Sequence, residues 1–115
     1  MRKSILLLTL LVSLLSYAQD NIEMAKDALM ADEYFETMYF ANRQLATNPN
    51  DAEALMYRSI AYYYTNDNAA AIEDIEKAIA VWNKKCQMPI ASLYVLRGGY
   101  YKESGNYRSE ERRVG

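Results

Sequence analysis

The sequence predicts an all-α fold in which antiparallel helix pairs stack against one another. Apolar side chains recur at steps of three and four residues through most of the 115-residue chain, which is the spacing of one helix face. The pattern also matches itself when the chain is shifted by about 34 residues, which indicates repeated structural units. No stretch alternates with a period of two, so we expect no β-sheet.

Residues 1–18 are expected to form a signal peptide that is not part of the fold. Arg2 and Lys3 make a positive start, and residues 5–15, ILLLTLLVSLL, are an apolar run. Small residues then stand one and three places before Gln19, as in a signal-peptidase site. A membrane-spanning helix needs about 20 apolar residues, so cleavage is favoured over a membrane tether formed by an uncleaved segment. The predicted location is periplasmic or extracellular, with no membrane span after cleavage.

The body of the chain divides into three repeat units, at residues 19–51, 52–83 and 91–107. The shift between the first two units places Asp32 on Asn66, and both lie in a polar break between apolar stretches. A longer shift, from the second unit to the third, places Arg58 on Arg97. The five additional residues fall in the connector 83–90, because a loop accepts added length at little entropic cost.

Each unit is predicted to contain two helices, as the second unit shows. Asn50 and Glu53 follow Pro49 in the form of a capping box, which opens a helix. Short polar side chains at 66–68 end that helix, because they compete for backbone hydrogen bonds. The next helix carries one apolar stripe, made of Ala71, Ile72, Ile75, Ala78, Ile79 and Trp82.

The third unit has a first helix at about residues 90–104, and we expect a turn at Gly105 and Asn106. Tyr107 is expected to begin the second helix. The last eight residues, RSEERRVG at 108–115, lack an apolar stripe and resemble the in-frame translation of a sequencing-library adapter. They are therefore interpreted as a non-native tail on an incomplete unit. Because about three repeats are needed for a stable stack, we expect marginal stability or aggregation.

The residue pattern resembles that of the tetratricopeptide repeat family. Residues that carry the resemblance in the second unit are Leu55, Ser59, Tyr62, Ala71 and Ala78. The stretch 48–55, NPNDAEAL, is similar to the family's junction between repeats, and the period of about 34 residues agrees with the family's. The resemblance covers residues 21–107. It implies a right-handed solenoid of about two and a half repeats.

Several residues depart from the family pattern. Thr37 and Gln44 replace two alanines of the first unit, so that helix pair is expected to pack less closely. Arg58 and Arg97 occupy a position that is usually apolar, and Asn83 stands where a proline is common. These departures affect single positions.

The resemblance implies that a concave groove, lined by the first helix of each unit, binds a peptide or protein partner. The expected groove residues of the second unit are Glu53, Met56, Tyr57, Ile60, Tyr63 and Tyr64, and the third unit adds Val95, Leu96, Lys102 and Glu103. Among them, Met56, Ile60, Tyr63 and Tyr64 are the expected anchors, because Met and Tyr suit adaptable interfaces. Burial of these side chains against a neighbouring helix is the alternative.

One known groove activity of the family is not expected here. Some members hold a C-terminal carboxylate with Lys, Asn and Arg side chains. The corresponding positions hold Ile22, Lys26, Tyr57, Ser92 and Leu96. Apart from Lys26, this set lacks the charge-assisted donors that a carboxylate needs.

Composition and charge exclude several other functions. Residues 19–107 carry eight Lys or Arg and thirteen Asp or Glu, a net charge of −5, so nucleic acid and anionic membranes are not expected partners. The chain has no His and one Cys, so we expect no enzyme activity, cofactor or metal site. Glu73, Asp74 and Glu76 are expected to form a solvated face. Cys86 is interpreted as a loop residue, with a reactive thiol as the alternative.

The sequence is also consistent with two further functions. The repeats could be the N-terminal region of a longer enzyme or signalling sensor. They could also form a self-association module through the exposed third unit. The intact gene beyond residue 107 separates the first of these from a simple scaffold, and concentration-dependent size separates the second.

Overall fold

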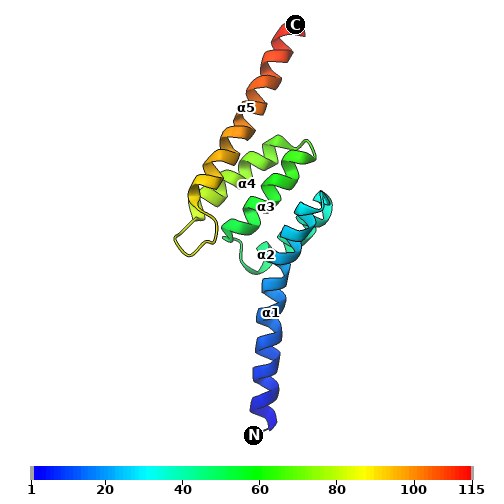
Figure 1. The fold of residues 1–115 in the computed structure, drawn as a ribbon, viewed down its shortest axis with the longest axis vertical. Helices are drawn as coiled ribbons and strands as arrows, with labels where there is room; N and C mark the ends of the chain where they lie inside the picture. Colours follow the sequence, from blue (N-terminus) through cyan, green and yellow to red (C-terminus); the bar gives the residue numbers. More distant parts are fainter. Residues whose placement is uncertain (1, 115) are drawn as a thin grey trace.

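The computed structural model describes the backbone of residues 2–114 and the side chains of residues 4–12 and 21–105. The described backbone is helical and contains no strand, which confirms the predicted all-α class. Its five helices are α1 (Arg2–Met30), α2 (Tyr34–Thr47), α3 (Ala52–Tyr64), α4 (Asn68–Val81) and α5 (Ile90–Val114). The molecule measures 74 × 28 × 20 Å, because α1 and α5 project from opposite ends of the packed middle (Figure 1).

The order of helix packing follows the order of the chain. Each helix packs against the next, from α1 against α2 to α4 against α5. Two further contacts join α1 to α3 and α3 to α5. The odd-numbered helices therefore form one row, and this row positions the candidate site.

The turn between α1 and α2 has the same geometry as the turn between α3 and α4. Asp32 and Asn66, which occupy equivalent repeat positions, adopt left-handed backbone conformations with φ of 59° and 67°. The N–H of the next residue, Glu33 or Asp67, donates to the carbonyl five residues back, at 2.8 and 2.9 Å. These bonds close the C-terminal ends of α1 and α3. The period of the sequence is thus repeated in the backbone hydrogen bonds.

Aspartate side chains cap the N-termini of α3 and α4. Asp51 and Asp67 each accept the backbone N–H three residues further on, at 3.1 and 3.2 Å. The expected capping box of Asn50 and Glu53 is wrong. The cap lies one residue later because a carboxylate at Asp51 also complements the positive end of the helix dipole. Glu53 instead accepts the Tyr57 hydroxyl at 2.9 Å.

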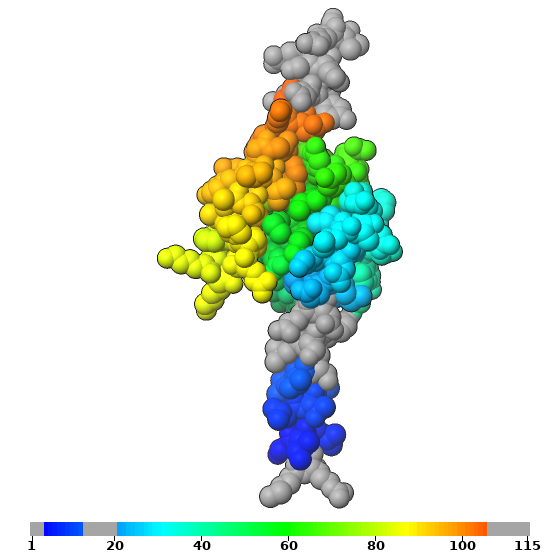
Figure 2. Space-filling view, viewed as in Figure 1, coloured from blue at the N-terminus to red at the C-terminus, as the bar shows by residue number. Residues whose placement is uncertain are grey.

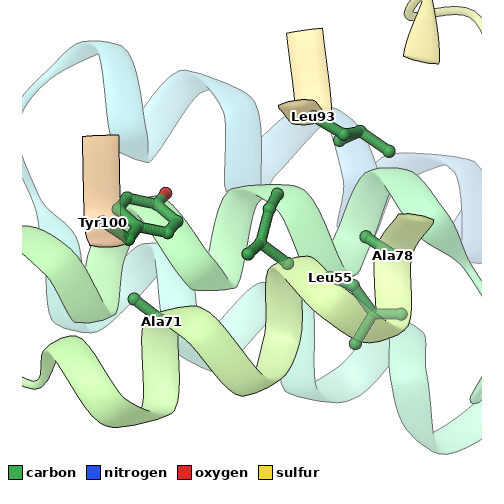
Figure 3. Packing of buried hydrophobic residues seen from close by; sticks show 6 residues of the cluster. Leu55, Ala71, Ala78, Leu93 and Tyr100 are labelled. Atoms are coloured by element: carbon green, nitrogen blue, oxygen red, sulfur yellow. The ribbon is translucent and has the colours of Figure 1, made fainter. Parts of the chain in front are cut away.

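The hydrophobic core lies where α3, α4 and α5 meet (Figure 3). It consists of Leu55 on α3, Ala71, Ile75 and Ala78 on α4, and Leu93 and Tyr100 on α5, each at most 3% exposed. The alanines allow the helices to approach closely, while the larger side chains fill the remaining space. Ile72, Ile79 and Trp82 pack around this core, which confirms the apolar stripe predicted for α4.

A buried carboxylate links three helices. Asp74 on α4 is 6% exposed, and its two oxygens each accept a hydrogen bond of 2.7 Å from Arg58 on α3. The Nη1 atom of Arg58 also donates to Asn42 on α2 at 2.9 Å. The expectation that Asp74 belongs to a solvated face is wrong, because the arginine at a usually apolar position draws it inward. Glu73 and Glu76 keep more of their surface than Asp74 does.

Two polar side chains of α2 are buried where alanines are expected. Thr37 is fully buried, and its hydroxyl donates to the Glu33 carbonyl at 2.9 Å. Gln44 is 9% exposed, and its amide donates to Asp51 at 2.9 Å. Hydrogen bonding therefore satisfies the Thr37 hydroxyl and the Gln44 amide nitrogen, whereas Gln44 Oε1 is buried without a partner among the described residues. The helix α1 stays packed against α2.

Residues 5–12 of α1 project away from the body of the molecule (Figure 2). Their large apolar side chains are 55–69% exposed, whereas Asn21, further along the same helix, is 4% exposed. Within the part of the chain that the structure describes, no helix has both the length and the apolar character needed to cross a membrane. The predicted cleavage site lies outside the described side chains, and cleavage there stays a prediction.

The helix α5 does not turn at Gly105 and Asn106. It runs without interruption from Ile90 to Val114, so the expected turn and the separate helix beginning at Tyr107 are wrong. Glu and Arg, which are frequent after residue 107, favour helix, and one glycine costs only about 1 kcal/mol within a helix. The side chains of the tail 108–115 lie outside the described residues.

The connector between α4 and α5 is held by Trp82. Its indole Nε1 donates to the Met88 carbonyl at 3.0 Å, and both side chains pack against the core. Cys86 lies in the same connector as a half-buried free cysteine. The additional residues between the second and third units are thus accommodated in an ordered loop.

Candidate functional site

A row of four tyrosines connects α2, α3 and α5. Tyr34 begins α2 and stacks on Tyr64, the last residue of α3, with ring centroids 5.0 Å apart and ring planes 10° apart. Tyr64 meets Tyr63 edge to face at 5.3 Å, and Tyr63 meets Tyr100 of α5 at 5.2 Å. We call these four residues the tyrosine row. Aromatic pairs at such distances add about 0.5–1.5 kcal/mol to the energy of burial.

The two left-handed turns bring the row together. One turn precedes Tyr34 and the other follows Tyr64, and the two turns lie at the same end of the helix pairs (Figure 1). The Tyr34 hydroxyl also donates to Asp32 Oδ1 at 3.2 Å. Desolvation and this neighbouring carboxylate raise the pKa of Tyr34 above its ordinary value. The ring is therefore fixed to its own turn as well as to Tyr64.

A hollow of about 280 Å³ opens beside the tyrosine row. Its lining residues are Tyr63, Tyr64, Asn66, Asn68 and Glu103. Small-molecule sites usually enclose about 300–1,000 Å³. The hollow is thus better suited to one or two side chains of a partner than to a cofactor.

Asn68, at the start of α4, fixes the position of α5 at this hollow. Its Nδ2 donates to the Tyr100 carbonyl at 2.9 Å and contacts Ser104 Oγ at 2.5 Å. The hydroxyl of Tyr100 lies 3.0 Å from Ser59 Oγ on α3. One residue of α5 is therefore bonded to both helices of the preceding unit, which positions α5 beside the hollow.

The hollow combines aromatic faces with one carboxylate. Glu103 is half-buried and is the only acidic or basic side chain among the lining residues. Burial raises the pKa of Tyr100 to about 12, so this phenol is neutral at physiological pH. Electron-rich ring faces and a carboxylate both attract cations. The surface is therefore suited to a lysine or arginine side chain of a partner.

Four of the expected groove residues lie near this surface. Tyr64 is 57% exposed and Tyr63 is half-buried, and the structure brings both to the hollow. Lys102 is exposed on α5 but does not line the hollow, whereas its neighbour Glu103 does. Tyr64 is thus the expected anchor that is most available to a partner.

Val95 is 74% exposed and Leu96 packs against the core, and neither lines the hollow. The expected groove residues that remain lie deeper. Tyr57 is 8% exposed, and its hydroxyl is bound by Glu53. Burial and the Glu53 carboxylate raise the pKa of Tyr57. Met56 packs against the core, and Ile60 is half-buried. Of these four residues, Tyr57 has the least surface left for a partner.

The sequence pattern does not predict that Tyr34, Asn68 or Tyr100 lies at the site. The repeat period could have predicted the position of Tyr34. Asp32 and Asn66 are equivalent in the repeat, so the turns that contain them lie at the same end of the helix pairs. Residues next to equivalent turns are then neighbours in space. No such signal existed for Tyr100, because its contact with Tyr63 depends on how α5 is rotated against α3.

A second hollow, of about 290 Å³, lies between the two connectors. Its lining includes Asp51, Lys85 and Cys86 but no aromatic residue. It offers mixed charges and no large apolar contact area, which an anchored partner would need. We therefore place the candidate site at the tyrosine row.

The described residues include no group of three or more His, Cys, Asp or Glu side chains arranged to hold a metal ion. A scan against models of protein families finds no match, and a search of curated proteins finds no similar one. Function is therefore inferred from the geometry of the chain itself.

Proposed function

We propose that the protein is an interaction scaffold of the tetratricopeptide type that binds a peptide or protein segment at the tyrosine row. The exposure of Tyr64 carries this proposal. A large aromatic ring that is 57% exposed, stacked on Tyr34 and placed at the edge of a hollow has the features of an interface anchor.

The arrangement of the helices supports a right-handed solenoid of about two and a half repeats. The matching turns at Asp32 and Asn66 give two helix pairs the same connection. The contacts of α3 with both α1 and α5 are those expected when first helices of successive units line one face. The tyrosine row lies at one end of that face.

The partner segment is expected to present a basic side chain beside an apolar or aromatic one. The apolar group packs on Tyr64, while the cation lies over Tyr63 and near Glu103. A cation–aromatic contact of this kind contributes about 0.5–2 kcal/mol. The acidic body of the chain favours the same partners through long-range attraction.

We further propose that the scaffold is exported and acts in the periplasm or outside the cell. The high exposure of the apolar side chains at residues 5–12 supports a role as a removable signal segment, because such a surface contributes nothing to the packed body. A membrane tether formed by the uncleaved segment is the alternative.

The proposal is tested by screening the purified full chain against a displayed library of random peptides. Peptides that bind are then measured against Tyr64→Ala and Tyr39→Ala. Tyr39 is a matched control, because it is 55% exposed on α2 and does not line the hollow. We expect Tyr64→Ala to weaken binding about tenfold, which corresponds to about 1.4 kcal/mol, and Tyr39→Ala to leave it unchanged.

The enriched peptides are also expected to contain Lys or Arg beside an aromatic residue. Equal binding to the wild type and to Tyr64→Ala would place the site elsewhere. Enrichment of acidic peptides would contradict the proposed role of Glu103.

A further inference from the structure

Two arginines at equivalent repeat positions make the same backward contact. Arg58 lies on α3, and its equivalent in the third unit is Arg97 on α5. The Nη1 atom of Arg58 lies 2.9 Å from Asn42 on α2, and Nη1 of Arg97 lies 3.5 Å from Glu76 on α4. Asn42 and Glu76 are themselves equivalent in the first and second units. Each arginine thus uses the same atom to reach the second helix of the preceding unit.

The second edge of the guanidinium group, formed by Nε and Nη2, is hydrogen-bonded in Arg58 but has no such bond to a described residue in Arg97. Nε and Nη2 of Arg58 donate to the two oxygens of Asp74, both at 2.7 Å. Within the described residues, no acceptor bonds to Nε or Nη2 of Arg97. The side chain of Arg97 is 36% exposed, against 24% for Arg58. Two parallel N–H donors match the two oxygens of a carboxylate.

The surface around Arg97 is aromatic and largely uncovered. The guanidinium carbon of Arg97 lies 5.0 Å from the centre of the Tyr94 ring, and the Tyr101 hydroxyl donates to Glu76 at 3.0 Å. Tyr94 and Tyr101 are 46% and 50% exposed, whereas the residue equivalent to Tyr94 on α3, Leu55, is 1% exposed. A Cβ added at Gly98 would meet no atom within 4 Å, although the equivalent residue, Ser59, is fully buried. The helix α3 is covered by α4. On α5 the equivalent face has no covering helix among the described residues.

We propose that this face binds an amphipathic helix of another polypeptide, with a carboxylate of that helix on the open edge of Arg97. We call the surface formed by Tyr94, Arg97, Gly98 and Tyr101 the Arg97 face. The helix it accepts resembles α4 in its spacing of small, acidic and apolar residues, which in α4 are Ala71, Asp74, Ile75 and Ala78. The repeat equivalence and the open guanidinium edge together specify this chemistry.

The alternative occupants are less well suited to the face. Residues 90–114 do not fold back onto it, because they form the one continuous helix α5. A second copy offers no free helix of the required kind, because its α4 is already packed against α3 and α5. Two Arg97 faces placed against each other would also bring like charges together.

The Arg97 face is separate from the tyrosine row. At 3.6 residues per turn, Arg97 lies about 120° around α5 from Glu103, and Glu103 lines the hollow beside the tyrosine row. Occupation of one surface therefore does not require occupation of the other, and failure of one proposal leaves the other standing.

The probe for this inference is a labelled synthetic peptide of residues 66–82, which contains the sequence of α4. Binding to the purified full chain is measured by fluorescence anisotropy. We expect the peptide to bind and its Asp74→Asn version to bind about tenfold more weakly, as the loss of a charged hydrogen-bonded pair predicts. The chain variant Arg97→Gln is expected to bind both peptides equally weakly.

A matched control is Lys84→Gln, which removes one positive charge from the exposed connector and is expected to keep the preference for the unsubstituted peptide. An unchanged thermal transition of Arg97→Gln by circular dichroism shows that the variant folds. The charge-reversed pair, Arg97→Glu with a peptide carrying Asp74→Arg, is expected to restore binding.

Three results would overturn the inference. The peptide could fail to bind, or the wild-type chain could bind the unsubstituted peptide and its Asp74→Asn version equally. Sedimentation could also show a dimer of the chain alone that Arg97→Gln abolishes, in which case the occupant is a second copy.

Discussion

Arg58 is tolerated between helices because neighbouring side chains satisfy its guanidinium group. Asp74 and Asn42 accept hydrogen bonds from all three of its nitrogen atoms, and the bond to Asp74 raises the pKa of Arg58 further. Removal of one partner from a buried pair typically costs about 3–5 kcal/mol. The sequence marked Arg58 as unusual but left Asp74 on the outside, because helical spacing alone does not say how far a neighbouring helix covers the flank of α4.

The phenol of Tyr100 predicts a loss of stability in alkaline solution. Burial raises its pKa from 10.0 to about 12 in the folded chain. The neutral phenol therefore makes its full contribution to the free energy of unfolding below pH 10. This contribution is lost as the pH rises towards 12, because the phenol of the unfolded chain ionises first. The total effect is about 2–3 kcal/mol. Urea unfolding measured across this range checks it.

The matched variants are Tyr100→Phe and Tyr39→Phe, which remove a buried and an exposed phenol. The first is expected to make the alkaline fall in the free energy of unfolding smaller, leaving the part that the other buried phenol, Tyr57, supplies, and the second to leave the fall unchanged. An equal slope for the wild type and Tyr100→Phe would contradict the assignment.

At the scale of elements, the left-handed residues of the two turns control where α1 and α3 end. Asn66 has a φ of 67°, a conformation that costs a residue with a β-carbon about 1–2 kcal/mol but costs glycine little. We expect Asn66→Gly to preserve or raise the free energy of unfolding and Asn66→Ala to lower it by about 1 kcal/mol. Chemical unfolding measures both changes.

The control for this turn is Asn50→Ala, because Asn50 is exposed and its φ is not positive. Its effect is expected to stay within about 0.5 kcal/mol. If the alanine variants at Asn66 and Asn50 behaved alike, the left-handed geometry would not be what stabilises the turn.

The positions of the turns at Asp32 and Asn66 were predictable, but the end of α5 was not. Asp32 and Asn66 stand in polar breaks that recur at the repeat period, so the sequence locates both turns. The turn expected at Gly105 does not form, because a turn there requires a second helix to pack back on α5. Nothing in residues 108–115 supplies the apolar stripe for that packing, and propensity alone then continues the helix.

For the whole molecule, the exposed apolar segment predicts how a shortened chain behaves. Deletion of residues 2–12 is expected to leave the melting temperature of the body unchanged, because the large apolar side chains at 5–12 are 55–69% exposed. The deletion is also expected to reduce aggregation, since it removes an uncovered apolar surface. Circular dichroism and analytical ultracentrifugation measure the two effects. A fall in melting temperature would show that the segment stabilises the body.

The candidate site was predictable only in part, because it depends on how the repeat units stack in the whole molecule. Tyr63 and Tyr64 were expected in the groove because they lie on the first helix of a pair. Tyr34 and Tyr100 join them from α2 and α5, and those contacts depend on how three units stack. One sequence with a repeat period specifies the local pairs but not the rotation of one unit on the next.

Trp82 gives the molecule a built-in optical label. It is the only tryptophan of the chain, and its bond to the Met88 carbonyl places the indole where the second unit meets α5. Its emission therefore reports on that junction, whereas far-ultraviolet ellipticity reports on all helices at once. A fluorescence midpoint below the ellipticity midpoint would mean that α5 detaches while the two helix pairs are still intact. Coincident midpoints would mean that the array melts as one cooperative block.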